Sequence, residues 1–394
     1  MASINLNPNP LLKPSSFSVG RKKNPSFNFK PSSFPISLNK NNKSKLNLCK
    51  TFSITDDKWL HTSLFQSKRR SKFIIAEQHP SKEKYRDFSY VVVSIDKEDL
   101  EPRLLNKIDS PDRVYLPHES CNGLILLLYD GIWSSDPEIA KEALWNPTTN
   151  ELKILPTSPA SLDPRYETSN HNYFGFGYDS TTDDYKVIRF LMKRSNLRCS
   201  LAVAELYSLK TNSWKRVNFR PYTFHPCGDP FMKINANGTY YWLNNVNHNV
   251  DRNFIQSFNF VTEKFESYRV PMPPREKLEK FCHKRLVEYC GSLGLLASTC
   301  VLVDDVKHYG LQLWVWDDVS LSWSLESTFI VDKMRSFMGL FENDKLFYRQ
   351  PGGDLTVQDC AMDTVMNISN VCTHKVNIVF PFVENYVSLS SHGK

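Results

Sequence analysis

The chain has 394 residues, of which 41% are hydrophobic and 13% aromatic, so it has enough apolar side chains for a sizeable core. Its apolar stretches, such as 124–129, have the length of β-strands. None reaches the roughly 18 residues that a transmembrane helix needs, so we predict no contact with a membrane.

The net charge of +7 comes from one end of the chain. Residues 1–55 contain nine of the 49 Lys and Arg and no Asp or Glu, so the remainder has 40 basic and 42 acidic residues. General nucleic-acid binding requires concentrated positive charge. A body this close to neutrality therefore predicts no nucleic-acid partner.

Nine cysteines are scattered without a CxxC pair, which favours reduced thiols in an intracellular protein. Cys282-His283 with Cys290, and Cys372 with His374, come nearest to metal-ligand spacing but lack the paired pattern of a zinc site. We interpret these cysteines as core or surface residues. No metal and no cofactor is predicted.

Residues 1–55 are rich in Ser, Asn, Pro and Lys and show no apolar period, which predicts disorder. The start Met1-Ala2-Ser3, the serines and the absence of acids are typical of a plastid transit peptide. A low-complexity extension, or a gene model joined to a wrong first exon, would give the same pattern. The expected location is the chloroplast if the leader is genuine, and otherwise the cytoplasm or nucleus.

Residues 56–72 form a linker with a predicted short helix at Trp59–Phe65. The basic run Lys68–Arg70 is either a localisation signal or a solvated turn. Predicted strands follow at Phe73–Ala76, Phe88–Ile95, Leu100–Leu105 and Leu124–Tyr129.

One sequence pattern, which we call the repeated phrase, then recurs to residue 390. It consists of an apolar strand, a polar turn and a second strand, as in Leu144–Pro156. The turns contain Asn, Asp, Thr and Pro, which suit hairpin geometry. Equivalent positions at Trp145, Leu206, Phe258, Val315 and Val357 step by 61, 52, 57 and 42 residues. This spacing is typical of β-propeller blades with variable loops.

The fold class is therefore predicted as all-β, a β-propeller of about six blades over residues 73–390. Five blades are visible in the interior. We expect a sixth that combines the strands at Phe73–Leu105 with a strand pair at Val379–Leu389 and so closes the ring. In the fifth phrase Leu340–Arg349 is predicted to pair with Leu355–Asp359. The alternation Phe174-Gly175-Phe176-Gly177 predicts close backbone approach beside large rings.

These motifs resemble the plant F-box-associated domain over about residues 60–390. The resemblance rests on Cys121–Leu124, Leu144–Thr149, Phe176–Asp179 with Asp184–Val187, Glu205–Ser208 with Ser213-Trp214, Asn237-Gly238 with Tyr241-Trp242, Ser257–Asn259 and Leu313–Val315. It implies a plant protein, related to the S-locus F-box and F-box-kelch-like proteins, whose propeller captures a protein substrate.

In that family an N-terminal F-box docks on the adaptor of a cullin-type ubiquitin ligase. Residues 1–55 contain no Leu-Pro pair and no basic helix with Cys and Trp of the kind that an F-box carries, whereas Trp59–Ala76 resembles the segment that follows it. The resemblance therefore implies a substrate-recognition module for protein ubiquitination and leaves the adaptor as a partner open. The alternative is a plastid-targeted or decoy propeller with no link to a ligase.

Catalytic motifs are not apparent, so we predict a non-enzymatic protein. The pairs Asp183-Asp184, Asp304-Asp305 and Asp317-Asp318 are interpreted as turn residues. A hydrolase or sugar-binding propeller remains a second hypothesis. It would require convergent polar side chains at the centre of the ring.

The candidate protein-binding residues lie in two loops rich in aromatic and basic side chains. Tyr and Arg are common interface anchors. The first loop, Asn218–Phe231, has Phe219, Arg220, Tyr222, Phe224 and His225, and the second, Pro271–Arg285, has Arg275, Lys277, Lys280, His283, Lys284 and Arg285. The alternative is that both are ordinary solvated connections. The tryptophans of the repeated phrase are predicted to be core residues.

Overall fold

All the regular elements are β-strands in the computed structural model, which describes the following residues: 70–80, 87–96, 101–111, 115–129, 142–160, 162–163, 166–167, 174–193, 200–218, 233–244, 254–266, 270–271, 281–303, 306–331, 334–360, 364–372 and 374–390. Within these ranges no helix has the length and hydropathy needed to cross a membrane. The linker helix expected at Trp59–Phe65 and the leader lie outside them. Arg70–Lys72, expected in the linker, belong to the first strand.

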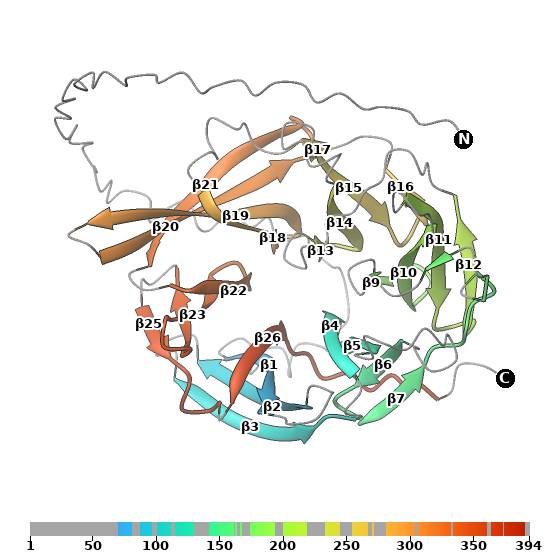
Figure 1. The fold of residues 1–394 in the computed structure, drawn as a ribbon, viewed down its shortest axis with the longest axis horizontal. Coiled ribbons are helices and arrows are strands. Elements are labelled where there is room, and N and C mark those ends of the chain that lie inside the picture. The colour runs from blue at the N-terminus through green and yellow to red at the C-terminus, as the bar shows by residue number, and fades with distance from the viewer. Residues whose placement is uncertain are drawn as a thin grey trace, which may run out of the picture. The chain divides into compact units, whose positions relative to one another are not determined.

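Six antiparallel sheets form the six blades of a propeller (Figure 1). From the inner strand outward, blade A has β26 (Lys375–Pro381), β1 (Arg70–His79), β2 (Asp87–Asp96) and β3 (Pro102–Asp109). Blade B has β4 (Tyr115–Cys121), β5 (Leu124–Tyr129), β6 (Ala143–Asn146) and β7 (Glu151–Ile154). Blade C has β9 (Phe174–Asp179), β10 (Asp184–Lys193), β11 (Ser200–Ser208) and β12 (Ser213–Val217), and the short β8 (Tyr166–Glu167) also pairs with β10.

The remaining blades follow the same plan. Blade D has β13 (Lys233–Ala236), β14 (Thr239–Asn244), β15 (Phe254–Asn259) and the short outer pieces β16 (Lys264–Phe265) and β17 (Val270–Pro271). Blade E has β18 (Phe281–Tyr289), β19 (Ser292–Val303), β20 (Val306–Asp317) and β21 (Ser322–Val331). Blade F has β22 (Ser336–Phe341), β23 (Lys345–Arg349), β24 (Leu355–Asp359) and β25 (Thr364–Asn367).

Each pair of neighbouring blades shares a buried apolar cluster, and these clusters hold the ring together. Trp145 packs between blades A and B with Tyr90 and Ala76, and Leu155 packs between blades B and C with Phe176 and Leu209. Equivalent clusters lie between C and D, D and E, E and F, and F and A. The prediction that the tryptophans of the repeated phrase are core residues is confirmed for Trp145, which is fully buried.

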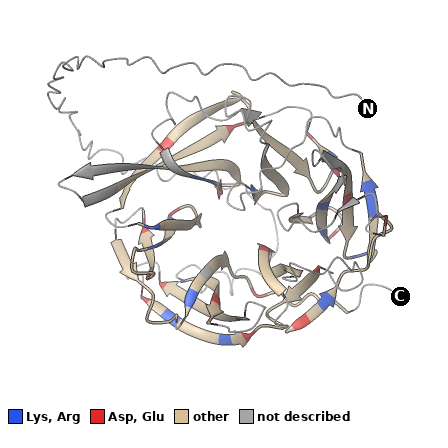
Figure 2. Cartoon of the chain, viewed as in Figure 1, with Lys and Arg blue, Asp and Glu red and all other residues tan. Residues whose placement is uncertain are grey.

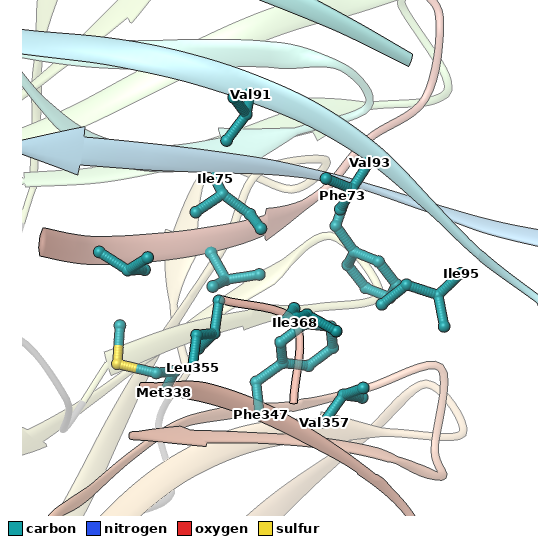
Figure 3. Close-up of a cluster of buried hydrophobic side chains, with 12 residues drawn as sticks. Phe73, Ile75, Val91, Val93, Ile95, Met338, Phe347, Leu355, Val357 and Ile368 are labelled. Atoms are coloured by element: carbon teal, nitrogen blue, oxygen red, sulfur yellow. The ribbon is translucent and has the colours of Figure 1, made fainter. Parts of the chain in front are cut away.

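The ring closes within blade A, where the C-terminal strand β26 pairs with the N-terminal strand β1. Phe73, Ile75 and Val93 of this blade face Phe347 and Val357 of blade F in one buried cluster (Figure 3). The predicted sixth blade built from both ends of the chain is thus confirmed. The pairing covers the edge of β1 that would otherwise be unpaired, and β26 becomes the inner edge strand of the blade.

The repeated phrase marks the same strand in every blade. Its five reference positions fall on the third strand of blades B to F, namely β6, β11, β15, β20 and β24. Third strands end in a polar residue whose side chain accepts backbone hydrogen bonds from the following turn, as Asn146, Asn259 and Asp317 do. These Asx turns explain why the phrase recurs.

Two details of the predicted strands are wrong. Leu340–Arg349 is not one strand: residues 342–344 form the turn between β22 and β23, where Glu342 and Asn343 have positive φ. The C-terminal region is not a strand pair, because only β26 belongs to a sheet. Its continuation, residues 382–390, which we call the C-terminal strap, is extended without sheet pairing.

The C-terminal strap joins blades A, B and C through side chains. Asn146 Nδ2 of blade B donates to the carbonyl oxygens of Asn385 and Val387 at 3.0 and 2.9 Å. Glu151 Oε2 accepts the amide of Leu389 at 2.7 Å, and Leu389 is buried in the cluster between blades B and C. The strap therefore reinforces the closure that β26 provides.

Candidate functional site

The two ends of the blades differ in the length of their connections. Because strands in a blade alternate in direction, the turns from first to second strand and from third to fourth strand share one end, which we call the tight-turn face. Ten non-glycine residues with positive φ occupy these turns: Asn122, Asn150, Asp183, Asn212, Asn237, Glu263, Cys290, Leu321, Glu342 and Asn343. The C-terminal strap also contacts this face, at Asn122 and Thr148.

The opposite end, which we call the long-connection face, receives the connections between second and third strands and those between blades. These connections include residues 130–142, 218–232, 245–253 and 272–280. Loops that vary in length on a rigid scaffold are common positions for binding residues. The long-connection face is therefore the candidate binding face.

Both predicted binding loops start and end at strand ends on this face. The first connects β12 to β13 and the second connects β17 to β18. Arg285 lies in β18 and is half-buried. The other eight candidates lie outside the described residues: Phe219, Arg220, Tyr222, Phe224, His225, Arg275, Lys277 and Lys280. The described strand ends that flank the two loops therefore lie on the long-connection face.

Convergent polar side chains lie on the inner strands β4 and β13 and on the adjacent second strand β14. We call them the inner-strand cluster: His118, Glu119, Lys233 and Tyr240. Lys233 Nζ of β13 lies 3.2 Å from Glu119 Oε1 of β4 and also contacts the His118 ring. The Tyr240 hydroxyl donates to Glu119 Oε1, and the amide of Phe176 donates to Glu119 Oε2 at 2.9 Å. This cluster joins blades B, C and D close to the ring axis.

Local backbone features create this cluster. A β-bulge between Pro117 and Glu119 places His118 out of register with β5, and bulges re-aim side chains. Gly175 leaves room for the Tyr240 ring, since a Cβ there would lie 2.7 Å from it. Gly177 does the same for Phe260, at 2.2 Å. The predicted close approach beside the Gly–aromatic alternation is confirmed.

Burial sets the protonation behaviour of the cluster. Burial raises the pKa of Glu119, although Lys233, Tyr240 and the Phe176 amide act to lower it. Burial lowers the pKa of Lys233, against the charge of Glu119. Burial and the same carboxylate raise the pKa of Tyr240. Because the Glu119 carboxylate already accepts from three donors, the cluster acts as a tie between blades. The sequence did not reveal it, since a lone His-Glu pair in a strand is not a recognisable motif.

The paired aspartates have structural roles where the structure describes them. Asp184 is buried and accepts hydrogen bonds from Ser208 Oγ and the Lys210 amide, at 2.6 and 2.9 Å. Asp317 caps its turn through the Val319 amide, and Asp318 accepts from Trp316 Nε1. Their interpretation as turn residues is confirmed, while Asp304-Asp305 lies outside the described residues.

No group of three His, Cys, Asp or Glu in the described ranges is placed to hold a metal ion. Cys121, Cys290, Cys360 and Cys372 are free thiols. Burial raises the pKa of Cys121, Cys360 and Cys372 to about 12, which disfavours the reactive thiolate.

The sequence matches the model of the F-box associated beta propeller domain over residues 64–348, most of the chain. This match agrees with the propeller that the structure shows. The chain belongs to this family. The F-box-associated domain resemblance drawn from the motifs is therefore confirmed.

Curated relatives from Arabidopsis thaliana carry F-box names. F-box protein CPR1 is 26% identical over 231 residues, covering 55% of this chain and 52% of CPR1. F-box protein At4g22390 is 34% identical over 135 residues, covering 29% of this chain and 31% of its own. The putative F-box/kelch-repeat protein At1g12170 is 26% identical over 287 residues, covering 66% of this chain and 72% of At1g12170. The chain thus spans about half or less of the first two relatives.

Solved structures give a weaker likeness. An oligogalacturonate lyase in complex with manganese aligns with a TM-score of 0.40 and 10% identity, covering 75% of this chain and 78% of the lyase. This likeness is too low to bear on function.

Proposed function

We propose that this protein is a recognition module that binds a protein substrate on its long-connection face. The observation that carries the proposal is the division between the two faces in a member of the F-box-associated family. The tight-turn face is occupied by hairpin turns and the C-terminal strap. The opposite face has the long connections, one of which contains Phe219, Arg220, Tyr222 and Phe224 and another Arg275, Lys277 and Lys280.

The inner-strand cluster does not favour an enzyme over this proposal. Its carboxylate and ammonium groups bond to one another and to the backbone. A general acid or base needs an atom within reach of a substrate proton. The cluster therefore supports a rigid scaffold, and the substrate contacts fall to the loops.

The substrate role can be tested by affinity capture with the full-length tagged chain. One variant changes Arg220, Tyr222, Arg275 and Lys277 to serine on the long-connection side. The matched control changes Lys210, Lys215 and Lys264 to serine on the tight-turn face, where all three are exposed. We expect the first variant to lose partners that the wild type and the control retain. Equal loss in both variants, or retention in both, would contradict the proposal.

We further propose that the captured protein is presented to a cullin-type ubiquitin ligase. The support is the F-box name shared by the relatives and the family match. Co-purification of the ligase adaptor with the full-length chain is the expected result. If the adaptor is absent while substrates are still captured, the module acts outside the ligase, as a decoy or a plastid-located binder.

The location is part of this proposal. A ligase role requires the cytoplasm or nucleus, whereas a genuine transit peptide in residues 1–55 would direct the chain to plastids. A fluorescent reporter fused after residue 70, with residues 1–70 at its N-terminus, separates the two. Import of the reporter into chloroplasts would contradict a ligase role in the cytoplasm or nucleus. A reporter that remains outside the chloroplasts would contradict the plastid alternative.

A further inference from the structure

The inner strands of blades E, F and A bring basic residues to the long-connection face. β22 lies between β18 and β26 around the ring axis and contacts both strands. Lys284 lies in the first half of β18, Arg335 directly precedes β22, and Lys375 is the first residue of β26. Figure 2 shows Lys and Arg segments on strands that border the centre of the ring, β18 and β26 among them.

Arg335 and Arg349 form the core of this basic group. The Arg335 amide donates to the Arg349 carbonyl oxygen at 2.8 Å, so the two residues are adjacent across the hairpin end. Arg349 Nη2 donates to the carbonyl of Val376, which follows Lys375 in β26. The buried Arg349 Nε has no hydrogen-bond partner. Burial, and then the charge of Arg335, lower the pKa of Arg349.

These four cations, two half-buried and two exposed, differ from the fully buried basic groups of the protein. Lys186, Arg189 and Lys345 each bind a buried carboxylate, at 2.7, 2.9 and 2.6 Å respectively. Within the described ranges, no ion pair joins a carboxylate to Lys284, Arg335, Arg349 or Lys375. Half-buried Lys284 has its pKa lowered by burial alone. Arg335 and Arg349 are adjacent like charges, and an anion on this surface would offset their repulsion.

The other half of the inner ring is already neutralised. In blades B to D, Lys233 is paired with Glu119. The uncompensated charge is therefore confined to three neighbouring blades, and the body of the chain as a whole is close to neutral. A local strip of this kind suits a short anionic segment rather than a long polyanion such as nucleic acid.

We infer that Lys284, Arg335, Arg349 and Lys375 bind an anionic peptide segment of the protein substrate. The segment's charges are Asp and Glu carboxylates or phosphates, since guanidinium groups bind both through charge-assisted hydrogen bonds. The spread of the four residues over three blades requires more than one anionic group, spaced along an extended peptide. This inference rests on the proposed function, because it names the substrate feature that the long-connection face recognises.

Fluorescence polarisation on the full-length chain tests the inference. The probes are a fluorescein-labelled peptide of alternating Glu and Gly, the same peptide with phosphoserine at the Glu positions, and an uncharged version with Gln. Arg335→Gln with Lys375→Gln removes two exposed cations. Lys210→Gln with Lys264→Gln is the matched control on the tight-turn face. Both pairs are solvent-exposed, so both variants should fold.

We expect the Glu or the phosphoserine peptide to bind and the Gln peptide not to bind. The Arg335→Gln/Lys375→Gln variant should bind at least about tenfold more weakly, and the control should match the wild type. Tighter binding of the phosphoserine peptide would identify phosphate as the preferred anion. Equal binding of the Gln peptide, an equal loss in the control, or equal affinity for a single-stranded DNA oligonucleotide would overturn the inference.

The proposed function can fail separately. If Arg335→Gln/Lys375→Gln still captures partners that the loop variant loses, the long-connection face binds substrate without this basic group. The inference would then be wrong and the proposed function would stand. If neither variant changes capture, both fail.

Discussion

Ile75 in β1 lies directly opposite Val379 in β26, so strands from the two ends of the propeller pair at the inner side of blade A. Both side chains are buried in the cluster between blades A and F. The stability of the whole ring therefore depends on a contact between the first and last strands. Such non-local closure is the property that distinguishes a propeller from a linear stack of sheets.

Val379→Asp should open this closure. The variant should lose at least about 3 kcal/mol of unfolding free energy, because the apolar cluster offers no partner for the charge of the new aspartate. Val383→Asp is the matched control, since Val383 in the C-terminal strap is 60% exposed, and should change stability by less than about 0.5 kcal/mol. Urea unfolding of both variants gives the two values, and similar losses would contradict the closure.

Gly123→Ala tests the C-terminal strap. Gly123 has φ of +83°, and a Cβ there would lie 2.1 Å from the Val383 carbonyl oxygen. Gly291 occupies the same turn position in blade E with φ of +78° and nothing within 4 Å. Gly291→Ala should therefore cost only the backbone strain of about 1–2 kcal/mol, and Gly123→Ala should cost measurably more. Equal midpoints in thermal unfolding would show that the strap contributes nothing.

Leu321→Asn should stabilise the protein. Leu321 has φ of 51° and its side chain is 60% exposed, so it has backbone strain and little burial to compensate it. Asn tolerates the left-handed region, and we expect a gain of about 1 kcal/mol. Leu325→Asn, at a position 46% exposed within β21, should give no gain because Asn is unfavourable in a strand.

Lys233→Met should make stability depend on pH. At pH 7 it leaves the buried Glu119 carboxylate without its cation, which should cost about 3–5 kcal/mol. Burial raises the pKa of Glu119 above its unfolded value, so a protonated Glu119 favours the folded state. The loss relative to wild type should therefore shrink as the pH falls from 7 towards 5. A pH-independent loss in denaturant titrations would mean that Glu119 is not the group responsible.

The third strands were the most predictable part of the fold. Trp145, Leu206, Phe258, Val315 and Val357 mark them because each lies two or fewer residues from a polar turn with Asn, Asp or Ser caps. Local turn chemistry and apolar runs are legible in a sequence. The sixth blade was also predictable, since each end of the chain supplied the part that the other lacked.

The inner strands were harder to predict. β4 contains Pro117 followed by the polar His118 and Glu119, and a bulge lies at the same place. Its pattern is therefore neither apolar nor alternating. β22 and β23 meet at Glu342 and Asn343, a turn without Gly or Pro, and were merged into one strand for that reason. The basic group at Arg335, Arg349 and Lys375 is assembled from separate strands, so no linear motif could reveal it.

Cross-linking mass spectrometry of the full-length chain with a captured substrate tests the central claim most directly. With a lysine-reactive reagent, we predict intermolecular cross-links at Lys284 and Lys375 on the long-connection face and at Lys277 and Lys280 in the loop that opens there. Lys210 and Lys264 on the tight-turn face serve as internal controls and should remain unlinked. Cross-links concentrated at Lys210 and Lys264 would contradict the assignment of the binding face.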